Sequence, residues 1–149
     1  MDKVLSLNQQ NVTLLSDLDE RRLGALVAGA FRASVVAGGE AFLISFDETA
    51  DYDSPNFEWF KSRYPRFVYV DRVAVDPSAR GKGLASLLYL DLFTRARAAG
   101  HRAVTCEVNI DPPNPGSDLF HSKLGFDEVG RATLASGKIV RYLHKLISD

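Results

Sequence analysis

The sequence of 149 residues predicts an α/β (α+β) fold with a mixed central sheet, in which a parallel βαβ core has antiparallel flanking hairpins and helices on both faces. The core follows from an apolar run at Phe67–Val75, a helix-forming run that begins at Leu84, and a second strand-like run at 102–110. Strand, helix and strand in this order imply parallel strands joined by a right-handed crossover. Hairpin patterns on either side of this unit imply the antiparallel flanks.

The elements ahead of the core are predicted from alternation and capping. Residues Val4–Asn8 alternate in polarity and predict a short first strand. Ser16 or Asp17 can cap the helix that follows. Two strand-like runs at 31–36 and 41–46 are separated by a turn that contains two glycines, and they predict a hairpin.

Residues 47–66 form an insert within what length and composition predict as a single domain, 1–149. A connection of this length is uncommon unless it acts on a ligand or contains a short helix. Asn56–Lys61 is predicted as that helix, with Ser54 as its cap and Pro55 at its first position. The remaining elements are a helix, a strand, a short helix and two hairpin strands, at 84–98, 102–110, 116–124, 126–134 and 138–147.

Composition argues against several classes of function. A formal net charge of -1 argues against nucleic-acid binding, which usually requires a basic excess. The single cysteine, Cys106, excludes an internal disulfide and a zinc cluster of thiolates, and we expect no metal. No apolar run approaches the ~18 residues of a membrane span, and the amino terminus lacks a signal-peptide pattern. We therefore expect a soluble, cytoplasmic protein without a membrane partner.

The glycine-rich turn after the central strand predicts an anion-binding site. Arg80-Gly81-Lys82-Gly83 lies between a strand that ends at Asp76-Pro77 and a helix that opens at Leu84. The first N–H groups of such a helix lack internal partners, and the helix dipole favours negative charge there. The glycines let a ligand oxygen approach the backbone, so a phosphate or pyrophosphate is the simplest ligand. The glycine spacing fits neither the P-loop nor the dinucleotide-binding motif.

Two motifs carry a resemblance to the GNAT family of N-acetyltransferases. Arg80, Gly83 and Ala85, after a strand that ends in Val-x-Pro, resemble the Gln/Arg-x-x-Gly-x-Gly/Ala loop that binds coenzyme A in that family. Asn114–Phe126 resembles the family pattern Asn-x-x-Ala-x-x-Leu-Tyr-x-x-x-Gly-Phe. The order of elements also resembles the family along nearly the whole chain, the insert excepted. Asp-Tyr-Asp-Ser-Pro-Asn and Glu-Val-Asn-x-Asp-Pro-Pro-Asn-Pro resemble a poorly characterised, bacterial-type branch.

The resemblance implies direct transfer of an acetyl group from acetyl-CoA, the co-substrate, to a primary amine. It implies that backbone groups of the central strand hold the thioester and the pantetheine, while the glycine-rich loop holds the pyrophosphate. The cofactor-binding residues that it implies are Val73, Ala74, Val75, Arg80, Gly81, Lys82, Gly83, Leu84, Ala85, Asn114, Ser117, Phe120 and His121.

His121 stands where the family usually has a tyrosine near the coenzyme sulfur. A histidine can also donate a proton, with an ordinary pKa near ~6.5 against ~10 for tyrosine. It can instead hydrogen-bond the sulfur or pack on the pantetheine. We interpret His121 as catalytic or sulfur-contacting, with a purely structural role as the alternative.

The acceptor side is predicted from two neighbouring strands. By period-two geometry every second residue from Tyr69 to Val75 shares one face of the central strand, which places Asp71 beside the acetyl-holding residues. Glu107 lies on the next strand, where the resemblance implies that the two strands splay apart. Asp71 and Glu107 are the catalytic candidates, and an ordinary solvated acid is the alternative for each. The substrate-binding candidates are Tyr69, Asp51, Tyr52, Asp53 and Asn109, whereas Phe57, Trp59 and Phe60 are interpreted as core residues.

Two alternatives to acetyl transfer remain open. The missing family tyrosine is compatible with a GNAT-like module that senses acyl-CoA without transferring the acyl group. A longer acyl donor is also compatible, because nothing in the sequence determines the depth of the acyl pocket. The acceptor is a small-molecule or peptide amine that no residue pattern identifies. The oligomeric state is open, with a homodimer as the state that the resemblance suggests.

Overall fold

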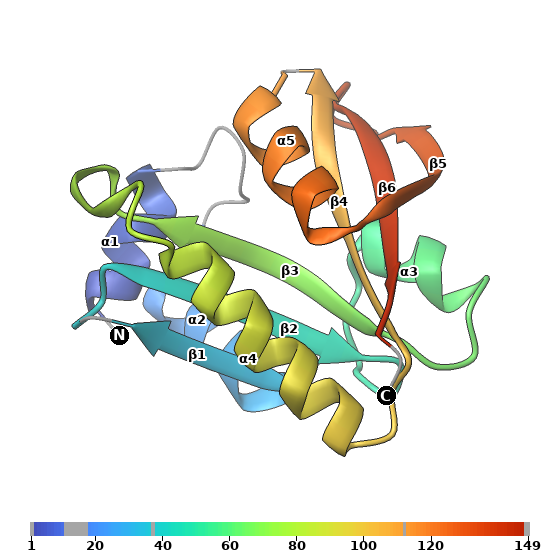
Figure 1. The fold of residues 1–149 in the computed structure, drawn as a ribbon, viewed down its shortest axis with the longest axis horizontal. Helices are drawn as coiled ribbons and strands as arrows, with labels where there is room; N and C mark the ends of the chain where they lie inside the picture. Colours follow the sequence, from blue (N-terminus) through green and yellow to red (C-terminus); the bar gives the residue numbers. More distant parts are fainter. Residues whose placement is uncertain (1, 11–17, 37, 112, 148–149) are drawn as a thin grey trace.

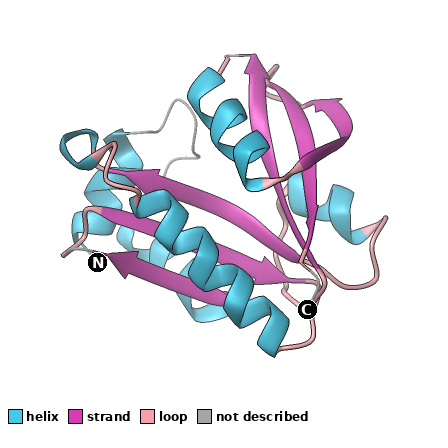
Figure 2. Ribbon diagram, in the orientation of Figure 1, coloured by secondary structure: helices cyan, strands magenta, loops and turns pink. Residues whose placement is uncertain are grey.

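A six-stranded mixed sheet forms the centre of the protein. The computed structural model describes residues 2–10, 18–36, 38–111 and 113–147. The strand order is β1-β2-β3-β4-β6-β5 (Figures 1 and 2). β3 and β4 are parallel and the other neighbouring strands are antiparallel, which confirms the predicted core and its flanking hairpins.

The strands are β1 (Arg32–Val36), β2 (Ala41–Asp47), β3 (Val68–Val75), β4 (Ala103–Asp111), β5 (Asp127–Thr133) and β6 (Ile139–Leu146). The helices are α1 (Asp2–Gln10), α2 (Glu20–Gly29), α3 (Pro55–Lys61), α4 (Leu84–Ala98) and α5 (Pro115–Leu124), together with the 3-10 turn η1 (Pro77–Ala79).

Helices cover both faces of the sheet, as predicted (Figure 1). On one face Leu88 of α4 packs in a buried cluster with Val68 of β3. On the other face α1, α2 and α3 contribute Leu7, Leu23 and Phe57 to a second buried cluster. The sheet therefore separates two hydrophobic layers. The glycine-rich loop leads directly into α4, so it lies on the side of the α4 layer.

The predicted first strand at Val4–Asn8 is wrong, because these residues belong to helix α1. The buried side chains of Val4, Leu7 and Asn8 follow the spacing i, i+3, i+4, which places them on one face of a helix. Five residues are too few to separate this spacing from the alternation of a strand. Packing of that helical face against the sheet decides between the two.

Side-chain caps begin α2 and α3, as well as α5. The predicted caps Ser16 and Asp17 lie outside the described residues. α2 begins after Asp19, whose Oδ1 accepts the backbone N–H of Arg22 at 2.7 Å. α3 begins as predicted, with Ser54 as the N-cap and a proline at its first position.

The aromatic residues of the insert fill the core, as predicted. Phe57 and Phe60 are completely buried. Trp59 stacks on Tyr142 of β6, with 4.2 Å between the ring centroids. A Cβ added at Gly130 of β5 would lie 2.4 Å from the Trp59 ring, so the indole occupies the space that a side chain would need there.

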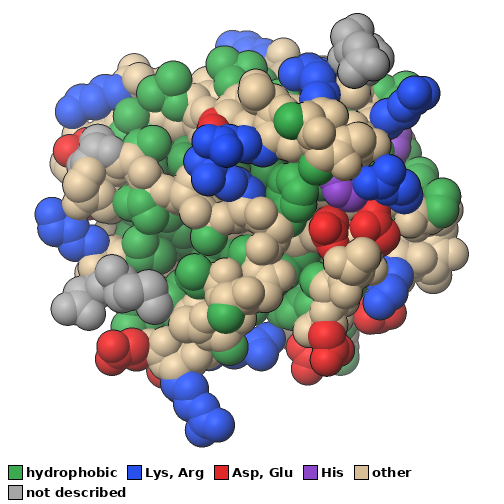
Figure 3. Space-filling view, turned by 90° about the horizontal axis from the view of Figure 1, so that it is seen from below, with side chains coloured by type: hydrophobic (Ala, Val, Ile, Leu, Met, Phe, Trp, Pro, Cys, Tyr) green, Lys and Arg blue, Asp and Glu red, His purple; other side chains and the backbone are tan. Residues whose placement is uncertain are grey.

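The surface is mixed in charge on the face seen from below. Lys and Arg side chains are interspersed there with Asp and Glu, and hydrophobic groups are exposed between them (Figure 3). A mixed surface of this kind is unlike the basic stripe of a nucleic-acid-binding domain. None of the helices described has both the length and the apolar character needed to cross a membrane.

Candidate active site

A cavity of about 530 Å³ opens where β3 and β4 separate. In the described residues the two parallel strands pair at Val68 with Val104 and at Tyr69 with Thr105, and beyond these pairs they diverge (Figure 1). The splay expected between them is therefore present. Residues of α2, β3, α4, β4, α5, β6, the start of α3 with the segment ahead of it, and the turn between β5 and β6 line the cavity.

The cavity brings together all the predicted catalytic residues and most of the predicted acceptor residues. The predicted residues in its lining are Tyr52, Asp53, Tyr69, Asp71, Val73, Glu107, Asn109, Asn114, Ser117 and His121. The predicted residues outside the lining are Asp51, Ala74, Val75, Phe120 and the loop at 80–85. Sequence reasoning missed Arg22, Tyr89, Ser136 and Lys138, which also line it.

A β-bulge changes which residues of β3 share a face. The register of β3 against β2 shifts at Asp71, which is an extra residue relative to β2. Tyr69 therefore packs on the side of α1, α2 and α3, whereas Val73 and Val75 pack on the side of α4. The prediction that every second residue from Tyr69 to Val75 shares one face is wrong, because it assumed a regular strand.

Glu107 of β4 faces the cavity and accepts a hydrogen bond from the hydroxyl of Tyr69. Burial raises the pKa of Glu107 from its ordinary 4.5 to about 8; the Tyr69 hydrogen bond opposes this rise and the charge of Asp71 adds to it. A carboxyl with such a pKa can accept a proton from an amine in the slightly alkaline range. Burial also raises the pKa of Tyr69 well above its ordinary 10, so the phenol stays a donor.

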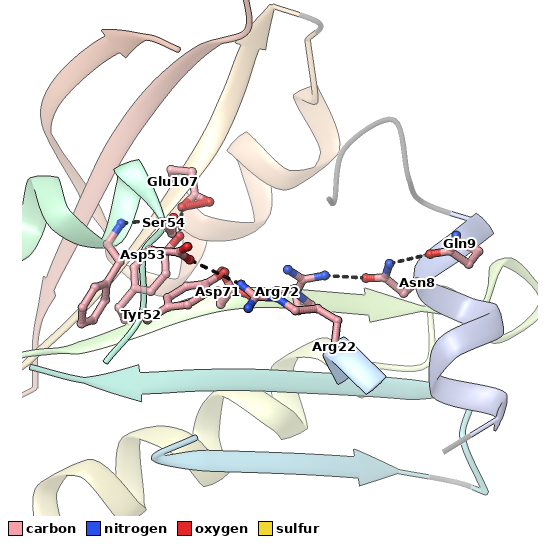
Figure 4. A network of polar contacts seen from close by, with 11 residues as sticks. Asn8, Gln9, Arg22, Tyr52, Asp53, Ser54, Asp71, Arg72 and Glu107 are labelled. Carbon is pink, nitrogen blue, oxygen red and sulfur yellow. Dashed lines mark hydrogen bonds and ion pairs between the residues drawn. The ribbon is translucent and has the colours of Figure 1, made fainter. Parts of the chain in front are cut away.

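Asp71 is held within a chain of polar contacts that crosses one face of the sheet (Figure 4). Its Oδ1 accepts from the Tyr52 hydroxyl and its Oδ2 from Arg72 Nε, each at 2.7 Å. Arg72 in turn donates to Asn8 Oδ1 of α1 at 3.0 Å. Because both oxygens of Asp71 accept hydrogen bonds and its side chain is only 5% exposed, the geometry favours orientation of Tyr52 over proton abstraction.

The acidic segment ahead of α3 contributes to the cavity unevenly. Tyr52 and Asp53 line it, whereas Asp51 is exposed and lies outside the lining. Asp53 is 91% exposed and lies 3.5 Å from the guanidinium of Arg22 on α2 (Figure 4). This ion pair forms a polar rim at the mouth of the cavity, close to the ring of Tyr52.

His121 of α5 is buried between α4 and its own helix. Its Nε2 lies 2.7 Å from the Tyr89 hydroxyl. Its Nδ1 lies 2.7 Å from the carbonyl oxygen of Ser117 and 3.2 Å from the Ser117 hydroxyl. Burial lowers the pKa of His121 below its ordinary 6.5, so the ring is neutral near pH 7. Asn114, besides lining the cavity, caps α5 by accepting the Ser117 N–H at 3.3 Å.

Tyr89 is a completely buried residue of α4 whose side chain reaches the cavity beside Cys106 and His121. The sequence alone indicates a packing role for Tyr89, because the first turns of α4 are apolar on most sides. A signal was nevertheless present, since the hydroxyl of a buried tyrosine needs a polar partner.

The glycine-rich loop has the geometry expected of an anion site. Gly81 and Gly83 have φ values of 82° and 76°, in the left-handed region that favours glycine. Gly83 is the N-cap of α4 and offers no side-chain cap, so the first N–H groups of the helix remain available to a ligand. Arg80 and Lys82 are exposed beside it.

Comparison with known sequences gives two matches. The family described as Acetyltransferase (GNAT) family matches residues 11–126 of this chain. A Phosphinothricin N-acetyltransferase from Streptomyces coelicolor is 39% identical over 71 residues, which make up 47% of this chain and 40% of that protein. The match to this curated relative thus spans less than half of its length.

Comparison with solved structures supports the fold over the whole chain. Ard1 from Thermoplasma volcanium superposes with a TM-score of 0.75 at 16% identity, covering 99% of this chain and 93% of that one. The NatC complex bound to Gag peptide and CoA superposes with a TM-score of 0.72 at 10% identity, covering 99% and 90%. At such identities the likeness shows the fold.

Proposed function

Because this chain belongs to the acetyltransferase (GNAT) family, we propose that it transfers an acetyl group from acetyl-CoA directly to a primary amine. The observation that carries the proposal is Glu107, a carboxyl with a pKa of about 8 in the cavity where β3 and β4 diverge. The curated relative is named as an N-acetyltransferase, and the NatC complex is bound to CoA. Both support the same chemistry.

Acetyl-CoA would lie along β3. Beyond Tyr69 the edge of β3 that faces β4 has no partner strand among the described residues. Backbone groups on this edge between Val73 and Val75 can therefore pair with the pantetheine as an added strand does. The pyrophosphate would bind the first N–H groups of α4, at Gly81–Ala85, beside the side chains of Arg80 and Lys82.

Glu107 would act as the general base on the acceptor side. The ammonium form of an acceptor must lose a proton before its nitrogen can attack the thioester carbonyl. With a pKa of about 8, Glu107 is ready to take this proton in the slightly alkaline range, and it is protonated below that range. Tyr52, Asp53 and Asn109 would contact the rest of the acceptor, which is a small molecule or a peptide with a free amine.

Two measurements test acetyl transfer. Isothermal titration calorimetry with acetyl-CoA is expected to show binding, and its absence at high micromolar concentration would refute the donor. Release of coenzyme A thiol is then followed across a panel of amines, and the products are weighed by mass spectrometry. We expect one acetylated amine for each thiol released. Thiol release without any acetylated amine would indicate hydrolysis instead.

A second candidate function is the sensing of acyl-CoA without transfer. His121 favours it, because this residue replaces the usual family tyrosine and has both ring nitrogens engaged within the protein. Binding of coenzyme together with no thiol release across the amine panel would support this function over transfer. Repeating the calorimetry with longer acyl-CoA thioesters tests whether acetyl is the preferred acyl group.

A further inference from the structure

The hydrogen bonds of His121 define which of its nitrogens carries the proton. Nδ1 lies 2.7 Å from the carbonyl oxygen of Ser117, which can only accept, so Nδ1 carries a hydrogen. Burial keeps the ring neutral by lowering the pKa of His121. A neutral imidazole has one N–H, so Nε2 is an acceptor and takes a hydrogen bond from the Tyr89 hydroxyl at 2.7 Å.

This tautomer gives His121 no Nε2 proton to offer to a sulfur. The phenols in the cavity lining are those of Tyr52, Tyr69 and Tyr89. The first two donate to the carboxylates of Asp71 and Glu107 on the acceptor side. Tyr89 donates to a neutral nitrogen, and this hydrogen bond is weaker than one to a carboxylate. Of the three phenol hydroxyls, that of Tyr89 therefore loses the least free energy when it turns to a developing thiolate.

We infer that Tyr89 donates the proton to the leaving thiolate and that His121 is its positioning residue, an inference that rests on the proposed acetyl transfer. As the tetrahedral intermediate collapses, the carbon–sulfur bond breaks and its electron pair stays on sulfur, which takes the hydroxyl proton of Tyr89. The attacking nitrogen, which is positively charged in the intermediate, loses its extra proton to the phenolate by way of water as coenzyme A leaves. The proton that Glu107 took from the amine passes to water in the same interval.

The groups around Tyr89 keep it protonated. Cys106 and Glu107 of β4 face it from the sheet and His121 faces it from α5, with Asp118 close to that imidazole. Burial first, and then Cys106 and Glu107, raise the pKa of Tyr89 well above its ordinary 10. A Tyr89 donor therefore adds no falling limb to the pH profile in the neutral range. An imidazolium donor would lose activity as the pH rises through the lowered pKa of His121.

The Tyr89→Phe variant tests the donor. It keeps the ring that packs on Phe93 and Phe126 and removes only the hydroxyl. We expect kcat to fall by about tenfold or more, with KM for acetyl-CoA and the melting temperature close to wild type. Tyr64→Phe is the matched control, because it removes a phenol hydroxyl outside the cavity lining and should leave the kinetics unchanged. A Tyr89→Phe kcat within about twofold of wild type would overturn the inference.

The His121→Gln variant separates positioning from donation. A glutamine oxygen can accept from Tyr89, so we expect this variant to keep most of the kcat that Tyr89→Phe loses, with the same shape of pH profile. A loss as deep as that of Tyr89→Phe would contradict the positioning role. A wild-type profile that falls with rising pH below the ordinary histidine pKa of ~6.5 would assign donation to an imidazolium instead.

Nitrogen-15 NMR of the His121 ring tests the geometry without any substrate. We expect a proton on Nδ1 and none on Nε2 in wild type, with a rise in the pKa of His121 in Tyr89→Phe because a donor to the neutral form is lost. A proton on Nε2 at neutral pH would overturn the inference. Failure of the proposed transfer itself is distinguished by the wild-type protein, which would then release no coenzyme A thiol with any amine of the panel, whether or not calorimetry shows acetyl-CoA binding.

Discussion

The hydroxyl of Tyr69 on β3 donates a hydrogen bond to Oε1 of Glu107 on β4, bridging the two parallel strands where they diverge. The backbone of Tyr69 belongs to the last paired position of these strands, opposite Thr105. Glu107, the candidate base, is thus held at the point where β3 and β4 begin to separate, next to the regularly paired part of the sheet. A group held in this way keeps its position better than one carried on a loop.

Glu107→Gln keeps the size of the side chain and removes its ability to accept a proton. We expect kcat/KM for the amine to fall by about 100-fold, the range typical of a lost general base. Calorimetry should show acetyl-CoA affinity close to wild type, because Glu107 lies on the acceptor side. Activity within about threefold of wild type would show that another group, or the free amine alone, supplies the deprotonated nucleophile.

Tyr69→Phe removes the hydrogen bond that opposes the rise in the pKa of Glu107. The pKa of Glu107 should therefore increase further, because the carboxylate loses a donor while its burial remains. In the pH profile of kcat/KM, the rising limb should move to higher pH than in wild type. Movement of that limb to lower pH would contradict the assignment of the limb to Glu107.

Arg80→Glu reverses a charge beside the first N–H groups of α4. We expect the Kd for acetyl-CoA to increase by about tenfold. The melting temperature should stay unchanged, because Arg80 is exposed. Arg102→Glu is the control, because it reverses an exposed charge beyond the other end of α4. Equal effects of the two variants on calorimetric affinity would mean that the loop makes no specific contact with the pyrophosphate.

Gly130→Ala tests the core role of Trp59. The new Cβ would lie 2.4 Å from the indole, so the stacked pair of Trp59 and Tyr142 must shift. Overpacking of this kind costs about 2 kcal/mol, and the melting temperature should fall by ~6 °C while catalysis persists. Gly24→Ala is the control, because it meets open space on α2 and should be neutral or stabilising. Equal melting temperatures would argue against a fixed indole.

The βαβ core, its flanking hairpins and α3 could be predicted because each has a local signal. Examples are the apolar run of β3, the glycine cap at Gly83 and the Ser54 cap. The first helix, α1, could not be predicted, because Val4–Asn8 fits both the helical and the strand periodicity. Packing against the rest of the protein decides between the two. The bulge at Asp71 leaves no local mark either, because the pairing with β2 creates it.

The cavity residues were predictable where the resemblance or the strand pattern pointed to them, as with Glu107 and His121. The protonation states of these residues were not predictable, because a pKa depends on burial and on neighbouring residues from other elements. Burial makes His121 neutral by lowering its pKa, and the contacts with Ser117 and Tyr89 on either side of the ring determine its tautomer. The role of Tyr89 could not be predicted, because an aromatic residue in an apolar helix is interpreted as a packing residue until its hydrogen-bond partner is known.

The pH dependence of acetyl transfer tests the central claim most directly. Single-turnover release of coenzyme A thiol is measured in wild type and in Glu107→Gln, with an acceptor amine that stays an ammonium ion throughout the pH range, so that its own titration does not contribute. The wild-type rate should rise through a pKa of about 8, the value that burial gives to Glu107, and this rise should be absent in the variant. A rise of the same size and midpoint in both proteins would contradict Glu107 as the base.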